Sequence, residues 1–193
     1  MISELVEANR SCRRFYEDHQ VGLKTLEALV DLARLSASGA NLQPLKYILA
    51  CQPDVNAEIF SCLAWAGYLK DWPGPEPGER PSGYIVILGD TTISKEFGVD
   101  HGIAGQSMLL GARDKGLAGC MLGSINRKDL RPILNIESHL KILLVLAIGK
   151  PKEEVVIETV GADGNIRYWR DAQAVHHVPK RALTDLIVAS HGS

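Results

Sequence analysis

Ser36-Ala37-Ser38-Gly39-Ala40-Asn41-Leu42-Gln43-Pro44 is an irregular stretch between a segment with helical periodicity and a segment typical of a strand. In residues 22–35, apolar side chains recur on one helical face and charged side chains on the other, which predicts an amphipathic helix. The small side chains that follow leave backbone N–H groups within reach of a ligand. Asn41 and Gln43 each add a hydrogen-bond donor and an acceptor. The stretch is therefore either a loop that grips a flat heterocycle or an ordinary helix end running into a polar turn.

A basic cluster lies near the amino end, in the sequence Arg10-Ser11-Cys12-Arg13-Arg14-Phe15. Arg10 and Arg13 are three residues apart and can point the same way. Together with the Ser11 hydroxyl they could hold a phosphate, because the planar guanidinium fork matches phosphate oxygens. The alternative interpretation is a solvated basic turn.

Hydrophobic patterning predicts the other elements along the chain. The expected helices cover residues 2–8 (with Ser3 as N-cap), 54–69, 95–115, 126–134 (capped by Asn126) and 182–189. The expected strands cover residues 46–51, 84–88, 142–148, 155–160 and 166–169, the last two as a hairpin or extended pair around Asp163-Gly164.

Three of these elements carry further information. The continuous apolar runs at residues 84–88 and 142–148 are typical of strands covered on both faces, and the second should be central. The helix at residues 95–115 has no charged side chain between residues 103 and 112. A helix that is apolar on nearly every side either crosses the domain centre or packs against another subunit. Gly116 is a plausible C-cap for it.

Residues 71–81 contain four prolines and two glycines, which predicts a loop without helix or strand. Such loops are often functional lids. Trp65, Tyr68 and Trp72 lie beside this loop in the sequence and could wall an aromatic pocket. They could equally be ordinary core and rim residues.

The chain has 193 residues and a net charge of −2, which fits one domain over residues 1–193 and argues against a general nucleic-acid binder. No apolar run approaches a membrane span, and the amino end lacks the apolar core of a signal peptide. The four cysteines are widely scattered, so we expect free thiols in a reducing cytoplasm.

Several catalytic and metal-binding patterns find little support. The glycine-rich segment at residues 116–124 lacks the GxGxxG order of a dinucleotide-binding fold. His176-His177 has no third metal ligand at a suitable spacing, so we predict no metal site. Asp100-His101 lacks a serine or cysteine partner that would mark a nucleophile. Lys180-Arg181 forms a second basic point late in the chain.

Taken together, these stretches resemble the flavin-dependent nitroreductase family over residues 2–189. The basic cluster is similar to the R-S-x-R-x-F signature of the family, and Ser36–Pro44 is similar to its P-S-x-x-N-x-Q-P motif. Residues 102–123 resemble its central helix and the G-L-G-rich segment that follows. Lys180-Arg181 looks like its late basic pair.

The resemblance implies an α+β nitroreductase fold, with a central, mostly antiparallel sheet flanked by helices. It also implies an intertwined homodimer with two FMN molecules at the subunit interface. The cofactor-binding residues implied by the motifs are Arg10, Ser11, Arg13, Ser38, Gly39, Asn41, Gln43, Leu122, Gly123, Lys180 and Arg181. The Ser38–Gln43 loop would reach the flavin of the other subunit. The substrate pocket would include Trp65, Tyr68, Lys70 and Trp72.

The implied activity is hydride transfer from NADH or NADPH through flavin N5 to a small electron-poor acceptor, such as a nitroaromatic or a quinone. Lys70 is a candidate for positive charge near the flavin pyrimidine, and no catalytic acid–base side chain is visible. Two alternatives are an FMN store or sensor without efficient turnover, and a dimeric scaffold with no cofactor.

This chain departs from the family pattern in a few places. Asn9 stands where members often have a basic residue, Ala37 replaces the motif proline, and Leu45 replaces the usual aromatic. The chain is also short for the family, so we expect the longer helical insertion at the active site to be absent. The loop at residues 72–81 would cover the pocket instead.

Overall fold

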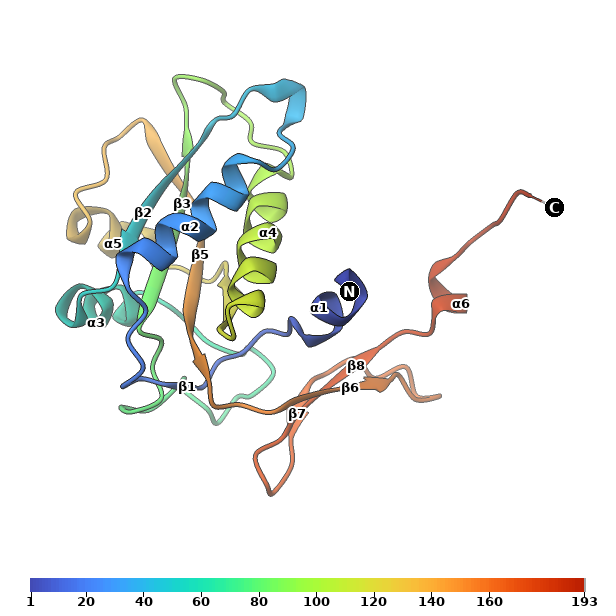
Figure 1. The fold of residues 1–193 in the computed structure, drawn as a ribbon. Helices are drawn as coiled ribbons and strands as arrows, with labels where there is room; N and C mark the ends of the chain where they lie inside the picture. Colours follow the sequence, from blue (N-terminus) through green and yellow to red (C-terminus); the bar gives the residue numbers. More distant parts are fainter. Residues whose placement is uncertain (193) are drawn as a thin grey trace. The chain divides into compact units, whose positions relative to one another are not determined.

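The computed structural model describes residues 1–192 and divides into two compact units (Figure 1). One unit comprises Met1–Trp65 with Pro73–Lys152. The other comprises Ala66–Trp72 and the chain from Glu153 onward. The single domain expected over residues 1–193 stays a prediction.

A five-stranded sheet forms the centre of the first unit, and all its strand pairs are antiparallel. Its strands are β1 (Phe15–Tyr16), β2 (Leu45–Ala50), β3 (Gly83–Asp90), β4 (Ala118–Leu122) and β5 (Leu140–Pro151). The strand order is β1-β5-β3-β2, and β4 also pairs with β5. All eight residues of β3 are buried, and β5 pairs with three other strands. The central antiparallel sheet and both buried strands are therefore confirmed.

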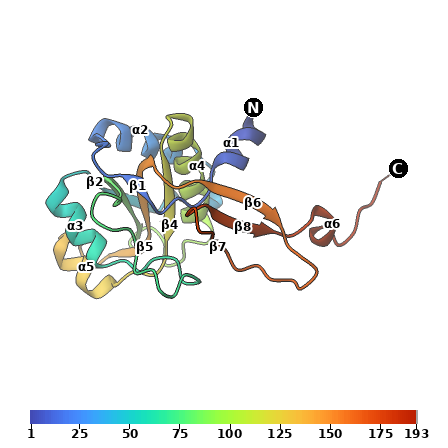
Figure 2. The same cartoon turned by 90° about the horizontal axis from the view of Figure 1, so that it is seen from below.

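Helices flank this sheet, as expected for the α+β class. They are α1 (Ile2–Ala8), α2 (Leu23–Arg34), α3 (Pro53–Ser61), α4 (Asp100–Asp114) and α5 (Arg127–Ile133). Helices α2 and α4 pack together on one face of β3 and β5 (Figures 1 and 2). A Cβ atom at Gly111 would lie 2.1 Å from Leu32 Cδ1, so the glycine allows α2 and α4 to approach closely. Asn126 caps α5 by accepting a hydrogen bond from the Asp129 amide, as predicted.

One expected cap and two expected helix boundaries were wrong, whereas the first helix has the expected bounds of residues 2–8. Helix α1 is capped by Met1, not by Ser3. Helix α3 ends at Ser61, because Leu63 bridges to Ile125 and Ala66 has a φ of 40°. Helix α4 begins at Asp100 instead of residue 95, since Gly98 takes a left-handed φ of 47° just before it. Gly116, with a φ of 70°, does follow the end of α4 in the conformation typical of a helix stop.

The second unit contains a three-stranded sheet of β6 (Val155–Thr159), β7 (Trp169–Arg170) and β8 (His176–Lys180). The strand order is β6-β8-β7, and β6 runs parallel to β8. The expected hairpin of residues 155–160 and 166–169 is therefore wrong. The pairing is decided by β8, where His177 contacts Glu158 of β6 through Nδ1 at 2.6 Å and stacks on Trp169 of β7.

The last helix is shorter than the expected residues 182–189. Helix α6 covers only Leu183–Leu186, and the apolar side chains of Leu183, Leu186, Ile187 and Val188 are exposed. Most helical stability in proteins comes from packing an apolar face, and α6 buries no residue within the described chain.

Candidate cofactor site

The basic cluster is fixed beside β4. The Cys12 amide donates to the Gly119 carbonyl at 3.0 Å, and Ser11 forms a parallel bridge with Gly119. A Cβ atom on Gly119 would lie 2.5 Å from the Ala147 carbonyl oxygen, so only glycine fits here. Close packing against β5 thus explains why the glycine-rich segment at residues 116–124 has a glycine at position 119.

The two arginines of the predicted phosphate clamp are partly buried. Arg10 Nη2 donates to the Val6 carbonyl at 2.7 Å, at the end of α1. Arg10 Nε is buried and has no hydrogen-bond partner among the described residues. Arg13 Nη1 donates to the Ser11 carbonyl at 3.4 Å, and the Ser11 side chain is exposed. A buried guanidinium nitrogen without an acceptor suits an anionic ligand.

Leu122 and Gly123 lie where β4 ends. Leu122 is buried, whereas Gly123 is exposed and a Cβ atom there would meet nothing within 4 Å. Ser11 pairs three residues before Leu122, so the basic cluster and the strand end lie roughly 10 Å apart along β4. Both groups therefore belong to one region of the first unit.

The Ser38–Gln43 loop is held by Asp100, the first residue of α4 and a buried carboxylate. Ser38 Oγ donates to Asp100 Oδ2 at 2.6 Å, and the Gly39 amide donates to Asp100 Oδ1 at 3.0 Å. The Gln43 amide in turn donates to Ser38 Oγ at 3.0 Å. Asp100 thus fixes the first end of the loop directly, and Ser38 links the second end to it.

The backbone of this loop is strained. Ala40, Asn41 and Gln43 have φ values of 49°, 55° and 51°, a left-handed conformation that disfavours residues other than glycine. Gln43 Nε2 donates to the Asn41 carbonyl and side-chain oxygens, both at 3.2 Å. Asn41 and Gln43 are exposed. Strain of this kind clusters at ligand-binding segments, which favours the ligand loop over the ordinary polar turn.

A cleft of about 570 Å³, part of it open to solvent, lies next to the loop between α2, β2 and α4. Ser38, Gln43, Tyr47 and Asp100 contribute to its lining. Burial raises the pKa of Tyr47, and the Asp100 carboxylate raises it further. Sequence reasoning missed Asp100 and Tyr47. The sequence feature that could have identified Asp100 is its position as an acidic residue at the start of a helix whose middle carries no charge.

Within residues 1–192, no hydrogen bond joins the Ser38–Gln43 loop to the basic cluster or to Gly123. One chain therefore presents two separate groups of predicted cofactor residues. One is the basic cluster with the end of β4, and the other is the strained loop with its cleft.

The predicted aromatic residues are divided between the two units. Trp65 belongs to the first unit, is buried and packs on Phe60 with ring centroids 5.6 Å apart. In the second unit, Tyr68 packs on Tyr168 at 4.9 Å, and Trp72 lies under the guanidinium of Arg170 at 4.1 Å. A common pocket wall stays a prediction.

The basic residues predicted in the second unit are all exposed. Lys180 ends β8, and its carbonyl accepts a hydrogen bond from the Val160 amide at 2.9 Å. Arg181 follows it, and Lys70 lies in the short segment of the unit that comes earlier in the chain. Their side chains are thus accessible to an anionic ligand, and their roles stay predictions.

The adjacent histidines bind carboxylates. His177 contacts Glu158 and also Asp171, whose Oδ2 lies 3.2 Å from its Nε2. His176 is buried with its Nδ1 3.5 Å from Glu153 Oε1. Residues 1–192 contain no group of three His, Cys, Asp or Glu side chains arranged to hold a metal ion. Within the same residues, no helix has the length and apolar character needed to span a bilayer.

Comparison with known proteins identifies the nitroreductase family, whose profile matches residues 6–71 and 81–150. A relative from Archaeoglobus fulgidus, named as an NADH dehydrogenase or NAD(P)H nitroreductase, is 25% identical over 159 residues, with 78% of this chain and 86% of the relative covered. A Bacillus subtilis relative, MhqN, named as an NAD(P)H nitroreductase, is 23% identical over 185 residues, with 79% of this chain and 90% of the relative covered.

Solved structures share the fold. The FMN-dependent nitroreductase of Clostridium difficile R20291 superposes with a TM-score of 0.66 at 22% identity, covering 80% of this chain and 89% of that one. A protein from Parabacteroides distasonis, described as an NADH dehydrogenase or NAD(P)H nitroreductase, has a TM-score of 0.65 at 21% identity, covering 88% and 96%. With the family profile matching most of its length, this chain belongs to the nitroreductase family.

Proposed function

We propose that the protein is an FMN-dependent oxidoreductase that uses NADH or NADPH to reduce a small electron-poor acceptor. The observation that carries this proposal is the basic cluster anchored on β4, where buried Arg10 Nε lacks an acceptor. The names of the relatives, which mention NAD(P)H and FMN, are consistent with it.

In this proposal the cluster holds the FMN phosphate. Arg10 and Arg13 supply charge-assisted hydrogen bonds, and the exposed Ser11 hydroxyl supplies another. The fixed backbone around Gly119 supports them, because a side chain there would collide with the Ala147 carbonyl. Lys180 and Arg181 are proposed as further basic ligands of the cofactor, and Gly123 leaves the backbone bare for the edge of the ring system.

The Ser38–Gln43 loop supplies polar contacts to the flavin of a partner subunit. Asn41 and Gln43 present amide groups at the surface, and Asp100 holds the loop that carries them. The separation of the two residue groups within one chain supports a homodimer, in which each site takes the phosphate clamp from one subunit and the strained loop from the other.

When bound, FMN supplies the redox chemistry, because it can accept hydride at N5 from a nicotinamide and pass it to an acceptor. The protein then contributes orientation, exclusion of water and charge. No side chain is assigned as a proton donor. Trp65, Tyr68, Lys70 and Trp72 remain the proposed substrate-pocket residues, with Lys70 as the cation near the pyrimidine.

The visible spectrum of the purified protein tests the proposal. We expect flavin absorption that bleaches on anaerobic addition of NADPH or NADH and returns with a nitroaromatic or a quinone. Protein that stays colourless after reconstitution with FMN would exclude the proposal. Bound flavin that neither nicotinamide reduces would instead identify a flavin store or sensor.

Arg13→Ala gives a matched test of the clamp. We expect its FMN affinity to fall at least tenfold, because one charge-assisted contact to phosphate is removed. Lys128→Ala, an exposed cation on α5, should retain FMN. Equal FMN content in both variants would remove Arg13 from the site.

A further inference from the structure

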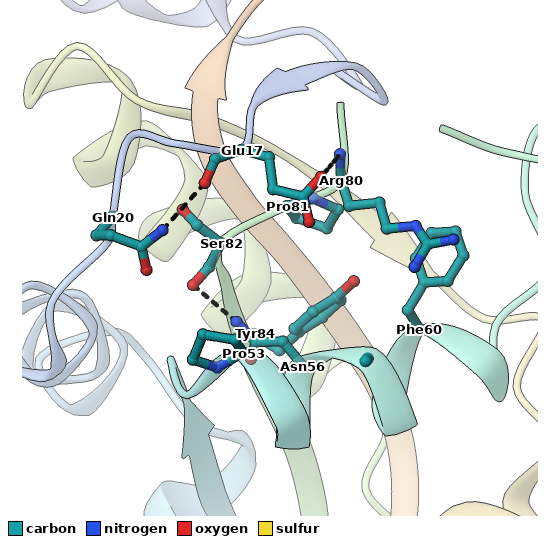
Figure 3. A pocket seen from close by; sticks show the side chains of 10 residues that line it. Glu17, Gln20, Pro53, Asn56, Phe60, Arg80, Pro81, Ser82 and Tyr84 are labelled. Atoms are coloured by element: carbon teal, nitrogen blue, oxygen red, sulfur yellow. Dashed lines mark hydrogen bonds between the residues drawn. The ribbon is translucent and has the colours of Figure 1, made fainter. Parts of the chain in front are cut away.

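A second cleft lies between α3 and the start of β3 (Figure 3). Helix α3 covers the side of the sheet opposite α2 and α4 (Figure 2). The turn that carries Glu17 and the chain at Arg80 complete the walls of the cleft. It encloses about 390 Å³, part of it open to solvent. All of its lining residues belong to the first unit.

Three buried polar atoms of this cleft have no hydrogen-bond partner among the described residues: Asn56 Oδ1, Tyr84 Oη and Arg80 Nε. The other polar atom of the Asn56 side chain does have a partner, because Asn56 Nδ2 donates a hydrogen bond to the Ser82 carbonyl at 2.9 Å. Most buried polar atoms in proteins are paired. Three buried polar atoms without partners around one cleft therefore point to a ligand with both acceptor and donor groups.

The cleft also carries two opposite charges that do not pair with each other. The Arg80 guanidinium carbon lies 4.3 Å above the Phe60 ring, and among residues 1–192 no carboxylate forms an ion pair with it. Glu17 Oε2 accepts hydrogen bonds from the amides of Gly78 and Arg80, which fix the carboxylate at the rim. A cation and an anion held apart on one cleft match a small zwitterion.

The Tyr84 hydroxyl can donate a hydrogen bond to a ligand in this cleft. Burial raises the pKa of Tyr84 far above its usual value; Arg80 lowers it slightly and Glu17 raises it. The hydroxyl therefore stays protonated at all physiological pH values. In Figure 3 the Tyr84 hydroxyl points toward the side of the cleft where Arg80 stacks on Phe60.

The cleft is separate from the proposed flavin site. None of its lining residues belongs to the basic cluster, the Ser38–Gln43 loop or the end of β4. Arg80 also lies in residues 72–80, the internal stretch that the nitroreductase family profile leaves unmatched.

We propose that this cleft binds a small α-amino acid, whose carboxylate is held by Arg80 and Tyr84 and whose ammonium group is held by Glu17 and Asn56. Arg80 Nε and Tyr84 Oη donate to the carboxylate, and Asn56 Oδ1 accepts from the ammonium group. Arg80 is partly exposed, so its side chain moves off the Phe60 ring to admit the ligand. The proposal does not depend on the flavin.

Calorimetric titration of the full-length protein with small probes tests the proposal. Glycine, L-alanine and L-serine are expected to bind, whereas acetate and methylammonium, which carry only one charged end, should bind at least tenfold more weakly. Equal binding of acetate and glycine would overturn the zwitterion assignment. Absence of binding by all the amino acids would overturn the site.

Tyr84→Phe distinguishes a ligand site from a structural irregularity. Without ligand this variant should melt at a higher temperature than the wild type, because it removes a buried hydroxyl without a partner. With L-alanine present, the order should reverse, since the variant loses at least tenfold in affinity. A variant that is less stable without ligand, or that gains as much from L-alanine as the wild type, would contradict the proposal.

Tyr16→Phe is the matched control, because Tyr16 is exposed and lies outside the cleft. It should respond to L-alanine as the wild type does. The FMN content of both variants should be unchanged, so failure of this proposal is separable from failure of the flavin assignment.

Discussion

At the scale of single residues, Asp100 is the side chain on which the candidate flavin loop depends. It is buried at the start of α4 and accepts hydrogen bonds from the Ser38 hydroxyl and the Gly39 amide. These are hydrogen bonds to a charged acceptor, so each is stronger than an average neutral one.

Asp100→Asn is expected to lower the free energy of unfolding by about 2 kcal/mol, because the amide nitrogen of Asn cannot accept a hydrogen bond. FMN affinity should fall with it, since the Ser38–Gln43 loop loses its anchor. Urea denaturation and quenching of flavin fluorescence measure the two effects. Asp114→Asn, at the exposed end of the same helix, is the control. Unchanged stability in Asp100→Asn would contradict the anchoring role.

Sequence reasoning found the loop but not its anchor. Asn41 and Gln43 stand out because their neighbours are small, and the structure places both at the surface. Asp100 lies more than fifty residues further along the chain, and nothing local marks it as their partner. The positive φ values at Ala40, Asn41 and Gln43 were equally hidden, because no glycine stands at these positions.

At the scale of elements, Glu79 ties the proline-rich loop to the strands around it. Arg14 Nε and Nη2 both donate to its carboxylate at 2.6 Å, and Lys152 Nζ lies 3.0 Å away. The hydrogen bond from Arg14 is the largest cause that lowers the pKa of Glu79 to about 2. Burial opposes this shift, and the hydrogen bond and charge of Lys152 add to the lowering.

Because the folded pKa of Glu79 lies below its ordinary value of 4.5, its stabilising effect is present above pH 4.5 and is lost as the pH falls toward about 2. Glu79→Gln should therefore reduce stability at neutral pH and flatten the decline between these two values. Urea midpoints across the acid range measure this, with exposed Glu58→Gln on α3 as the control. Parallel pH profiles for wild type and Glu79→Gln would rule out the effect.

In the second unit, His177 joins the strands as a clamp between Glu158 of β6 and Asp171. Desolvation alone would lower its pKa, but hydrogen bonds to Asp171 and Glu158 and their negative charges raise it overall above 6.5. A doubly protonated ring can donate to both carboxylates at once.

Because the pKa of His177 is raised in the folded state, its contribution to folding stability is fully present below about pH 6.5. This contribution is lost as the pH rises through the raised pKa. We expect amide exchange in β8 to accelerate, beyond the intrinsic increase with pH, across that transition. His177→Gln should remove the transition. Proton NMR of the imidazoles provides a direct comparison, with exposed His191 as the reference. A lower titration midpoint for His177 than for His191 would refute the clamp.

The elements that the sequence predicts well have strong periodicity of their own. Helix α2 and strands β3 and β5 were expected within a few residues of their observed bounds. The predictions that failed concern strand pairing that depends on residues far away in the sequence. Asp163-Gly164 is a good local hairpin signal, yet the strand before it pairs with β8, whose His177 supplies contacts that no local pattern contains.

At the scale of the whole molecule, α4 presents a face that the single chain leaves open. Val99, Gly102 and Gln106 are exposed there, and Ile103 is only partly buried. The nearly uncharged middle of this helix predicted either a central position or a subunit interface. It packs on α2 and the sheet with one side, and we propose that the other side meets a second subunit.

Gly102→Glu tests this interface, because a Cβ atom at Gly102 meets nothing within 4 Å and the single chain should tolerate the substitution. We expect a monomer in sedimentation experiments, and loss of FMN, since each proposed site takes the loop of the other subunit. Leu23→Glu, at an exposed position of α2, is the control and should remain dimeric. A Gly102→Glu variant that is still dimeric would place the interface elsewhere.

The position of β5 in the chain has a consequence for biosynthesis. This strand pairs with β1, β3 and β4, yet it is translated after all of them. Until the ribosome has released it, β3 can pair only with β2, and eight residues destined for the interior present an unpaired edge. We therefore expect a chain arrested before residue 140 to be prone to aggregation, because its unpaired edge stays exposed.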